Sequence, residues 1–313
     1  MDTTLKDRAA AIAGTQAKIK SIEAIAVKLP MAKPMKMAGV LIASADNVLV
    51  RIETDEGHVG WGEAASAPQM TGETMEGMTV AVRLMASAVI GCPLSAVAEA
   101  GTRLDVAMYG NNAAKAALEM AWHDALGKAL GKPVYELLGG KKRSRVPVLW
   151  LLGTGSIDGD VAEALAKKAA GFVAYKVKVG VGDPKDDALR TRKVCEALGK
   201  GLLISSDANQ GYSLEQALTY VKAVDGSGLD FFEQPISGHN IDGMTKLAAA
   251  TSIPIGFDEG LHSIDDLIND AGIVRKTFDR NINKMKDAGA RFAISSTHVT
   301  LVELPFGGPG PRW

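Results

Sequence analysis

Three carboxylates recur at near-equal intervals in the second half of the chain, each at the end of a short apolar run. They are Asp207 in ISSDANQGY, Glu233 in FFEQP and Asp258 in IGFDEG, separated by 26 and 25 residues. A parallel barrel has eight strand–helix units in about 250 residues, so one unit has close to this length. The spacing therefore predicts three acidic side chains next to one another on the C-terminal rim of a barrel, where active sites of that fold lie.

The whole stretch from residue 146 onward reads as strands alternating with helices. Candidate strands are residues 146–152, 172–179, 202–208, 230–235 and 253–259, and candidate helices are residues 159–170, 184–198, 213–224, 241–251 and 263–271. This alternation predicts a parallel sheet. Because charged residues end several strands, a barrel is favoured over a doubly wound sheet, which gathers its ligands at one switch point. No GxGxxG or P-loop pattern follows the strands, so nucleotide binding is not predicted.

The first part of the chain has a different pattern. Residues 19–62 indicate antiparallel strands with a turn at Asp55–Gly57, and residues 112–130 carry an apolar stripe that predicts a helix ended by Gly131 and Pro133. Between the strands, MAKPMKMAGV is expected to be a loop because prolines break regular structure. Its Met31, Met35 and Met37 would either line an adaptable substrate pocket or pack on a neighbouring domain. We expect a leader of residues 1–18, disordered or a frayed helix, then an α+β domain of residues 19–140 and a barrel domain of residues 145–313.

Composition narrows the class of partner. The chain has 35 basic and 36 acidic residues, so neither a nucleic acid nor a membrane is expected as a partner. Two distant cysteines, the lack of an 18-residue apolar span and an N-terminus unlike a secretory signal favour a cytoplasmic protein.

Two lysines add chemistry to the carboxylates. Lys176 and Lys178 in YKVKV lie on one face of the preceding strand, because strand side chains alternate. Three acidic oxygens suit Mg²⁺, or Mn²⁺ in its place, and a metal there would bind a substrate carboxylate. Neighbouring positive charges favour the neutral lysine that a general base needs. The set predicts proton transfer next to the carboxylate of a small-molecule substrate.

The same residues carry a family resemblance. The chain resembles the muconate cycloisomerase-like subgroup of the mandelate racemase/muconate lactonizing enzyme family, in the enolase superfamily. The resemblance lies in four motifs: KVK at 176–178, DANQGY from Asp207, EQP from Glu233 and DE at 258–259. The intervals from Lys178 to Asp207, Glu233 and Asp258 in turn, 29, 26 and 25 residues, are also similar. NNAAKAALEMAWHDALGKALGKPVYELLGG resembles the helix that leads from that family's capping domain into its TIM-type barrel. The resemblance covers roughly residues 19–270.

The resemblance implies roles for these residues. Asp207, Glu233 and Asp258 would be the Mg²⁺ ligands, Lys178 the acid/base, and Lys176 its electrostatic support. Asn209 and Gln234 would lie behind the ligands, with Asn209 also a candidate substrate contact. The 31–37 segment and residues 64–70 would close over the substrate, and Trp150, at the end of the first barrel strand, would line the pocket or pack in the core.

Residues 271–313 depart from the family pattern. Only 55 residues follow Asp258, too few for three further strand–helix units, so the barrel is expected to be incomplete at this end. The family's opposite-face lysine has one candidate here, Lys284, which comes late for the family's spacing and lacks its glycine pair. Three hypotheses follow: a muconate-type cycloisomerase, a racemase or epimerase of N-acyl amino acids or dipeptides, or a metal-binding family member with impaired catalysis. Because an open sheet edge needs covering, a homo-oligomer is expected.

Overall fold

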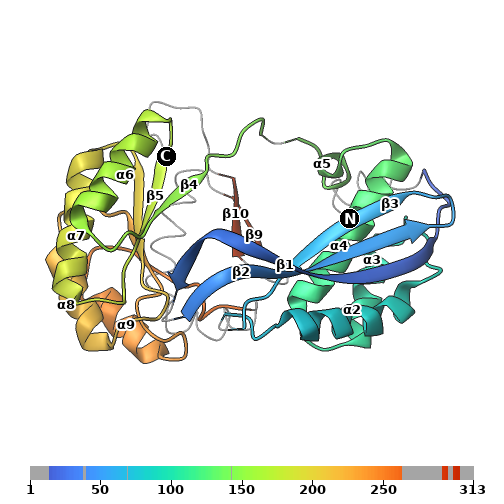
Figure 1. The fold of residues 1–313 in the computed structure, drawn as a ribbon, viewed down its shortest axis with the longest axis horizontal. Helices are drawn as coiled ribbons and strands as arrows, with labels where there is room; N and C mark the ends of the chain where they lie inside the picture. The colour runs from blue at the N-terminus through green and yellow to red at the C-terminus, as the bar shows by residue number, and fades with distance from the viewer. Residues whose placement is uncertain are drawn as a thin grey trace. The chain divides into compact units, whose positions relative to one another are not determined.

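The computed structural model describes residues 14–37, 40–68, 70–141, 143–262, 291–294 and 299–303 (Figure 1). The chain divides into two compact units, with the main boundary between Ser144 and Arg145. Each unit is considered by itself below. Among the described residues, no helix is both long enough and apolar enough to cross a lipid bilayer.

A three-stranded sheet forms one layer of the first unit. Its strands, in the order β1-β2-β3, are β1 (Ile19–Met37), β2 (Val40–Thr54) and β3 (Val59–Ala65). β2 and β3 pair antiparallel from Asn47↔Ala65 to Glu53↔Val59, and Gly57, with a φ of 85°, completes the turn between them. The predicted antiparallel strands and turn are confirmed here.

The loop predicted for residues 31–40 is wrong over most of its length. β1 continues through Met31 and Pro34 to Met37, and β2 begins at Val40. β1 is an edge strand, where a proline without an N–H can be accommodated because one side of the strand has no partner to receive it. Met31 is half-buried on β1, and the side chains of Met35 and Met37 lie outside the described part of the structure.

Helices cover this sheet and supply its core. They are α2 (Met75–Val89), α3 (Val97–Ala107), α4 (Asn112–Leu130) and α5 (Val134–Leu137). α4 has the predicted bounds and ends at Gly131 with a φ of 63°, the left-handed conformation that favours glycine. The helix lies directly on β3, because a Cβ added to Gly62 would lie only 1.9 Å from the carbonyl oxygen of Ala117.

The predicted leader needs a correction at its end. Residues 1–13 lie outside the described part, but Ala17 is fully buried and Leu94 donates its N–H to the Ala17 carbonyl over 2.8 Å. Lys18 forms a β-bridge with Pro93. Residues 15–18 are therefore part of the packed first unit and not of a disordered leader or a frayed helix, because they contribute hydrogen bonds and apolar burial to it.

A parallel sheet of five strands organises the second unit. In the order β4-β5-β6-β7-β8 they are β4 (Leu149–Leu152), β5 (Ala174–Lys178), β6 (Leu203–Asp207), β7 (Phe231–Glu233) and β8 (Ile255–Gly256). The four helices that alternate with them are α6 (Ile157–Ala169), α7 (Pro184–Leu198), α8 (Leu214–Val224) and α9 (Ile241–Ala249), which form a layer along one face of the sheet (Figure 1). The predicted alternation is confirmed through residue 256, and the predicted helix 263–271 lies outside the described residues.

The apolar core of this unit fills the space between the sheet and its helices. Tyr175, Val177 and Phe232 point into it from the strands, while Val194 and Leu247 reach it from the helices. Of residues 271–313, the structure describes β9 (Arg291–Ile294) and β10 (Val299–Glu303), which pair antiparallel in a sheet of their own.

Candidate functional site

The strand register brings the predicted site residues to one rim of the parallel sheet. Tyr175, Val177 and Val179 point into the helix-facing core, so Lys176 and Lys178 project from the opposite face of β5. Lys178 lies beside Asp207, and Asp207 beside Glu233. Because parallel strands place their C-terminal ends on one edge, these three side chains form a row.

Close polar contacts join this row. Lys178 Nζ lies 2.7 Å from Asp207 Oδ2 and 2.6 Å from Asn209 Oδ1. Lys176 Nζ lies 2.7 Å from Glu233 Oε2 and 3.4 Å from Asp207 Oδ2. Four residues predicted for the site, and Asn209 behind them, are thus in direct contact.

Gln234 brings Asp258 to the same rim. Its side chain is fully buried, and its Oε1 accepts hydrogen bonds from the backbone N–H groups of Asp258, over 2.8 Å, and Gly260, over 3.1 Å. Its Nε2 donates to the Ile236 carbonyl. The amide therefore fixes the backbone on both sides of Glu259, which agrees with the supporting position predicted for Gln234.

Asn209 joins opposite sides of the carboxylate group. Its backbone N–H donates to Asp207 Oδ1 over 2.9 Å, and its Nδ2 donates to Glu259 Oε1 over 3.0 Å. The other oxygen of Glu259, Oε2, is buried, and none of the described residues forms a hydrogen bond with it. A buried carboxylate oxygen without a donor is costly, so this point of the rim favours a bound cation or donor.

The electrostatics show how closely the acids are packed. Burial raises the pKa of Glu233 above its ordinary value, and the neighbouring Asp207 and Asp258 add to the rise, outweighing Lys176. Burial also raises the pKa of Glu259, with Asp258 and Asp207 again contributing. Four carboxylates therefore share one electrostatic environment, which is unfavourable unless positive charge is nearby.

Lys176 differs from the prediction that its neighbouring lysine would favour its neutral form. Burial acts to lower the pKa of Lys176, but contacts with Glu233 and Asp207 outweigh burial, and the pKa lies above its ordinary value. The carboxylates dominate because they are in hydrogen-bond contact with the ammonium group. Lys176 is therefore positively charged within this cluster.

The donor set is that of a site for a hard divalent cation. Among the described residues, no three His, Cys, Asp or Glu side chains are already gathered as a metal-binding group, and the Lys176 ammonium group lies between Asp207 and Glu233. All the acidic donors are oxygens, as Mg²⁺ prefers. By donor type the residues therefore fit Mg²⁺, which Asp207, Glu233 and Asp258 would hold.

Trp150 does not join this cluster in the described structure. Trp150 is on the helix-facing side of β4, where its Nε1 donates to Glu163 Oε1 over 3.2 Å and its ring packs against Phe172. Of the two roles predicted for Trp150, the structure supports packing on the core and contradicts the pocket, because Trp150 pairs with Tyr175 on β5 and so faces the same side as Tyr175 and not the side of the lysines. Met31 belongs to the first unit, and Lys284 and the side chains of Met35 and Met37 lie outside the described part of the structure, so the roles predicted for these four residues stay predictions.

Sequence reasoning missed one group near the site. Asp187 and Arg190 of α7 and Asp160 of α6 are buried together behind Lys178, although their residue types suggest solvent exposure. The sequence contains one indication of this burial: Asp187 and Arg190 lie on the same face of α7 as the buried Thr191 and Val194.

Comparison with known proteins agrees with the two-part organisation. The model of the mandelate racemase/muconate lactonizing enzyme N-terminal domain matches residues 21–139, and the enolase C-terminal domain-like model matches residues 160–269. An N-succinyl-L-Arg/Lys racemase of Bacillus cereus is 31% identical over 285 residues, which cover 90% of this chain and 76% of the relative. A chloromuconate cycloisomerase of Cupriavidus pinatubonensis is 31% identical over 298 residues, covering 93% and 80%.

Solved structures give the same picture. The muconate lactonizing enzyme from Pseudomonas fluorescens, complexed with muconolactone, matches with a TM-score of 0.77 and 33% identity over 84% of this chain and 71% of that one. A dipeptide epimerase from Cytophaga hutchinsonii, complexed with Mg and a dipeptide, matches with a TM-score of 0.73 and 29% identity, covering 83% and 69%. The fold is therefore an α/β TIM-type barrel with an N-terminal capping domain. These relatives are isomerases, and the chain belongs to the mandelate racemase/muconate lactonizing enzyme family of the enolase superfamily.

Proposed function

We propose that this chain is a Mg²⁺-dependent isomerase that moves a proton at the carbon next to a substrate carboxylate, with Lys178 as the acid/base. One observation carries the proposal: Lys178 Nζ is placed between Asp207 Oδ2 and Asn209 Oδ1 on the rim where four carboxylates converge. A general base must be held within hydrogen-bond distance of the proton that it removes, and these two contacts restrain the Lys178 amine at the rim.

Asp207, Glu233 and Asp258 would hold the metal. A Mg²⁺ ion held there would stabilise the negative charge that develops on the substrate carboxylate as the adjacent carbon loses its proton. The chain's own residues do the rest: Lys178 accepts or returns the proton at Nζ, and Lys176 supplies positive charge toward the substrate carboxylate. Asn209 and Gln234 keep the ligand backbone and Lys178 aligned.

For the substrate, we propose a muconate-like diacid that undergoes cycloisomerisation. That reaction needs one acid/base group on one face, and β5 supplies it in Lys178. The similarity to the muconate lactonizing enzyme from Pseudomonas fluorescens supports this choice.

Racemisation or epimerisation of N-acyl amino acids or dipeptides is the second candidate. It is favoured by the similarity to the N-succinyl-L-Arg/Lys racemase and to the L-Ala-D/L-Glu epimerase of Bacillus subtilis, which is 32% identical over 247 residues. This reaction requires a second acid/base on the opposite face, for which Lys284 stays the candidate. The predicted homo-oligomer also stays a prediction.

The test is a substrate panel in D₂O with Mg²⁺. Purified protein is incubated with cis,cis-muconate, an N-succinyl amino acid and the dipeptide L-Ala-L-Glu, and the products are followed by proton NMR. Lactone formation supports cycloisomerisation, whereas deuterium at the α-carbon without lactone supports epimerisation. If folded, Mg²⁺-bound protein gives neither product, both proposals fail and the third hypothesis, an impaired metal-binding family member, is favoured.

A further inference from the structure

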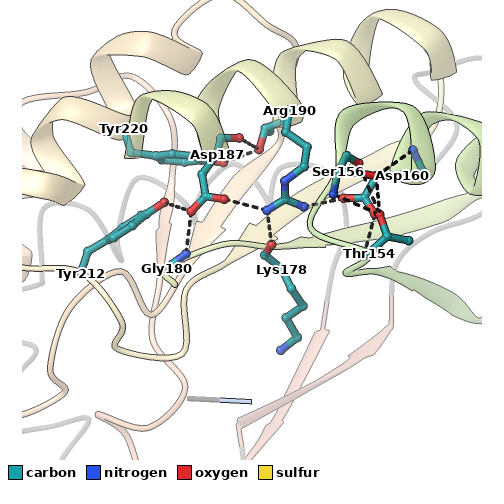
Figure 2. A network of polar contacts seen from close by, with 11 residues as sticks. Thr154, Ser156, Asp160, Lys178, Gly180, Asp187, Arg190, Tyr212 and Tyr220 are labelled. Atoms are coloured by element: carbon teal, nitrogen blue, oxygen red, sulfur yellow. Dashed lines mark hydrogen bonds and ion pairs between the residues drawn. The ribbon is translucent and has the colours of Figure 1, made fainter. Parts of the chain in front are cut away.

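A chain of buried charges lies directly behind Lys178. Arg190 of α7 is 5% exposed, and its guanidinium contacts the carboxylates of Asp160, which is 0% exposed, and Asp187, which is 8% exposed (Figure 2). Burying three charged groups carries a large desolvation cost, and apolar residues of similar volume are often as stable or more so. Stability alone therefore does not account for this arrangement.

The network fixes the backbone of the acid/base segment at consecutive residues. Arg190 Nη2 donates to the Lys178 carbonyl over 2.6 Å, and the Gly180 N–H donates to Asp187 Oδ2 over 3.0 Å (Figure 2). Between them, the Val179 N–H donates to the Asp207 carbonyl over 2.9 Å. Every residue from 178 to 180 thus has a backbone group tied to this network or to β6.

The same network reaches the loops on both sides. Asp160 Oδ1 accepts from the Thr154 N–H over 2.8 Å, in the loop that follows β4. Tyr212, in the loop that follows β6, donates its hydroxyl to Asp187 Oδ2 over 2.6 Å. Burial, and then Asp187, raise the pKa of Tyr212, so its hydroxyl stays a donor.

The loops after β5 and β6 also touch through their backbones. Gly180 has a φ of 96°, and a Cβ there would lie 2.6 Å from the Ala208 carbonyl oxygen. A Cβ on Gly211 would lie 2.3 Å from the Gly180 carbonyl oxygen. Little room is therefore left for the Lys178–Gly180 backbone to shift. The hydrogen bonds from the buried charged groups fix the orientation of its peptide groups.

We propose that Asp160, Arg190 and Asp187 are positioning residues, which hold the Lys178 backbone so that its amine stays in register with Asp207 and Asn209. This inference rests on the acid/base role proposed for Lys178. A small misplacement of a reacting group is expensive in rate, and a shift of about 1 Å can cost about 100-fold. The network acts through Lys178 and has no contact of its own with the reacting atoms.

Arg190→Lys is the main test, and Arg192→Lys is its matched control. The first variant keeps a buried cation for Asp160 and Asp187 but loses the planar fork that also reaches the Lys178 carbonyl. Arg192 lies on the same helix and likewise donates to backbone carbonyls, those of Ala223 and Asp225, far along the chain from Lys178. We expect Arg190→Lys to lower kcat about ten-fold per folded molecule with little change in KM, and Arg192→Lys to leave both unchanged.

A second pair of variants removes a single hydroxyl and no charge. Tyr212→Phe removes a bond to the Asp187 carboxylate. Tyr220→Phe, in the same buried ring cluster, removes a bond to Thr191, whose hydroxyl contacts the backbone carbonyl of Asp187 and not its carboxylate. We expect a smaller fall in kcat for Tyr212→Phe, and none for Tyr220→Phe. This pair decides the question if Arg190→Lys fails to fold.

Chemical labelling gives a readout that does not need turnover. Metal-free protein is treated with a limiting amount of acetic anhydride, and the modification of Lys178 relative to Lys176 is measured by peptide mass spectrometry. We expect this ratio to change in Arg190→Lys and Tyr212→Phe and to match the wild type in the two controls. Equal ratios in all variants would overturn the positioning role, even if the wild type proved inactive on every substrate tried. If the wild type turns over and both members of each pair retain equal kcat, the inference is likewise wrong while the proposed function stands.

Discussion

The two units differ in what they bury. In the described part of the first unit, the buried polar side chains are three uncharged threonines, Thr15, Thr54 and Thr79. The second unit buries charged and amide groups near its rim, Asp160, Asp187, Arg190, Asp207, Asn209 and Gln234. The interior of the first unit is therefore filled by close apolar packing. The interior of the second unit contains desolvated charged groups, which hold a lysine and a group of acidic side chains in place.

The consequence is a different sensitivity to substitution. The first unit depends on shape, since Gly60 and Gly62 let β3 approach the α4 backbone with no space for a side chain. The second depends on complete pairing, because an unpartnered buried charge costs more than a lost apolar contact. Substitutions in the first unit should therefore change stability, and those on the rim should change chemistry.

The largest effect is expected from Lys178→Ala. Replacing a general base typically lowers the rate by about 100- to 10,000-fold, so α-proton exchange or lactone formation should fall by that amount while Mg²⁺ binding persists. Lys185→Ala, an exposed lysine in the first turn of α7, is the control and should keep wild-type turnover. Near-normal turnover of the Lys178 variant would show that another group is the base.

Gly62→Ala should give the largest change in stability. Its new Cβ would meet the Ala117 carbonyl oxygen at 1.9 Å, and neither backbone can move without disturbing α4 or β3. Overpacking of this kind costs about 3 kcal/mol in the free energy of unfolding, which urea titration of the full chain would measure.

Gly101→Ala is the matched control for that change. Gly101 lies within α3, and among the described residues outside its own helix turn a Cβ there would meet Glu119 Oε1 alone, at 3.6 Å. This variant should gain about 0.5–1 kcal/mol, because alanine loses less backbone entropy in a helix. Equal effects of the two substitutions would contradict the account of the first unit as a close-packed interior.

Cys195 predicts a smaller, pH-dependent effect in the second unit. Burial raises the pKa of the Cys195 thiol from 9.0 to about 11. Between these values the unfolded chain releases a proton that the folded chain retains, so the free energy of unfolding falls as pH rises. At pH 10 this difference in thiol ionisation lowers the free energy of unfolding by about 1 kcal/mol. The loss should be absent in Cys195→Ala when unfolding is compared at pH 7.5 and pH 10 under reducing conditions. An identical pH dependence in the two proteins would show that the thiol titrates normally.

Much of the fold and rim could be predicted because the relevant signals are local. α4 follows from its apolar stripe and its glycine stop, and the row of Lys178, Asp207 and Glu233 follows from strand alternation and strand–helix length. These features depend on spacing along the chain, which the sequence states directly.

Other features depend on contacts that the sequence does not state. Pro34 suggested a loop, because a proline fits a strand only at the edge of a sheet and the sequence does not show which strand lies at the edge. The sequence left both a pocket role and a core role open for Trp150, because a short strand does not reveal which of its faces the helices cover. Asp187 and Arg190 are hydrophilic by type, and their burial follows from partners on α6 and in two loops.

Calorimetric titration of Mg²⁺ tests most directly the proposal that Asp207, Glu233 and Asp258 form a Mg²⁺ site next to Lys178. The wild type should bind one Mg²⁺ per chain, and Asp207→Asn should bind it much more weakly, because Asp207 is buried at the centre of the row. Asp225→Asn removes an exposed carboxylate at the end of α8 and should bind as the wild type does. Folded wild-type protein that takes up no Mg²⁺, or an Asp207→Asn variant that binds it equally well, would contradict the account.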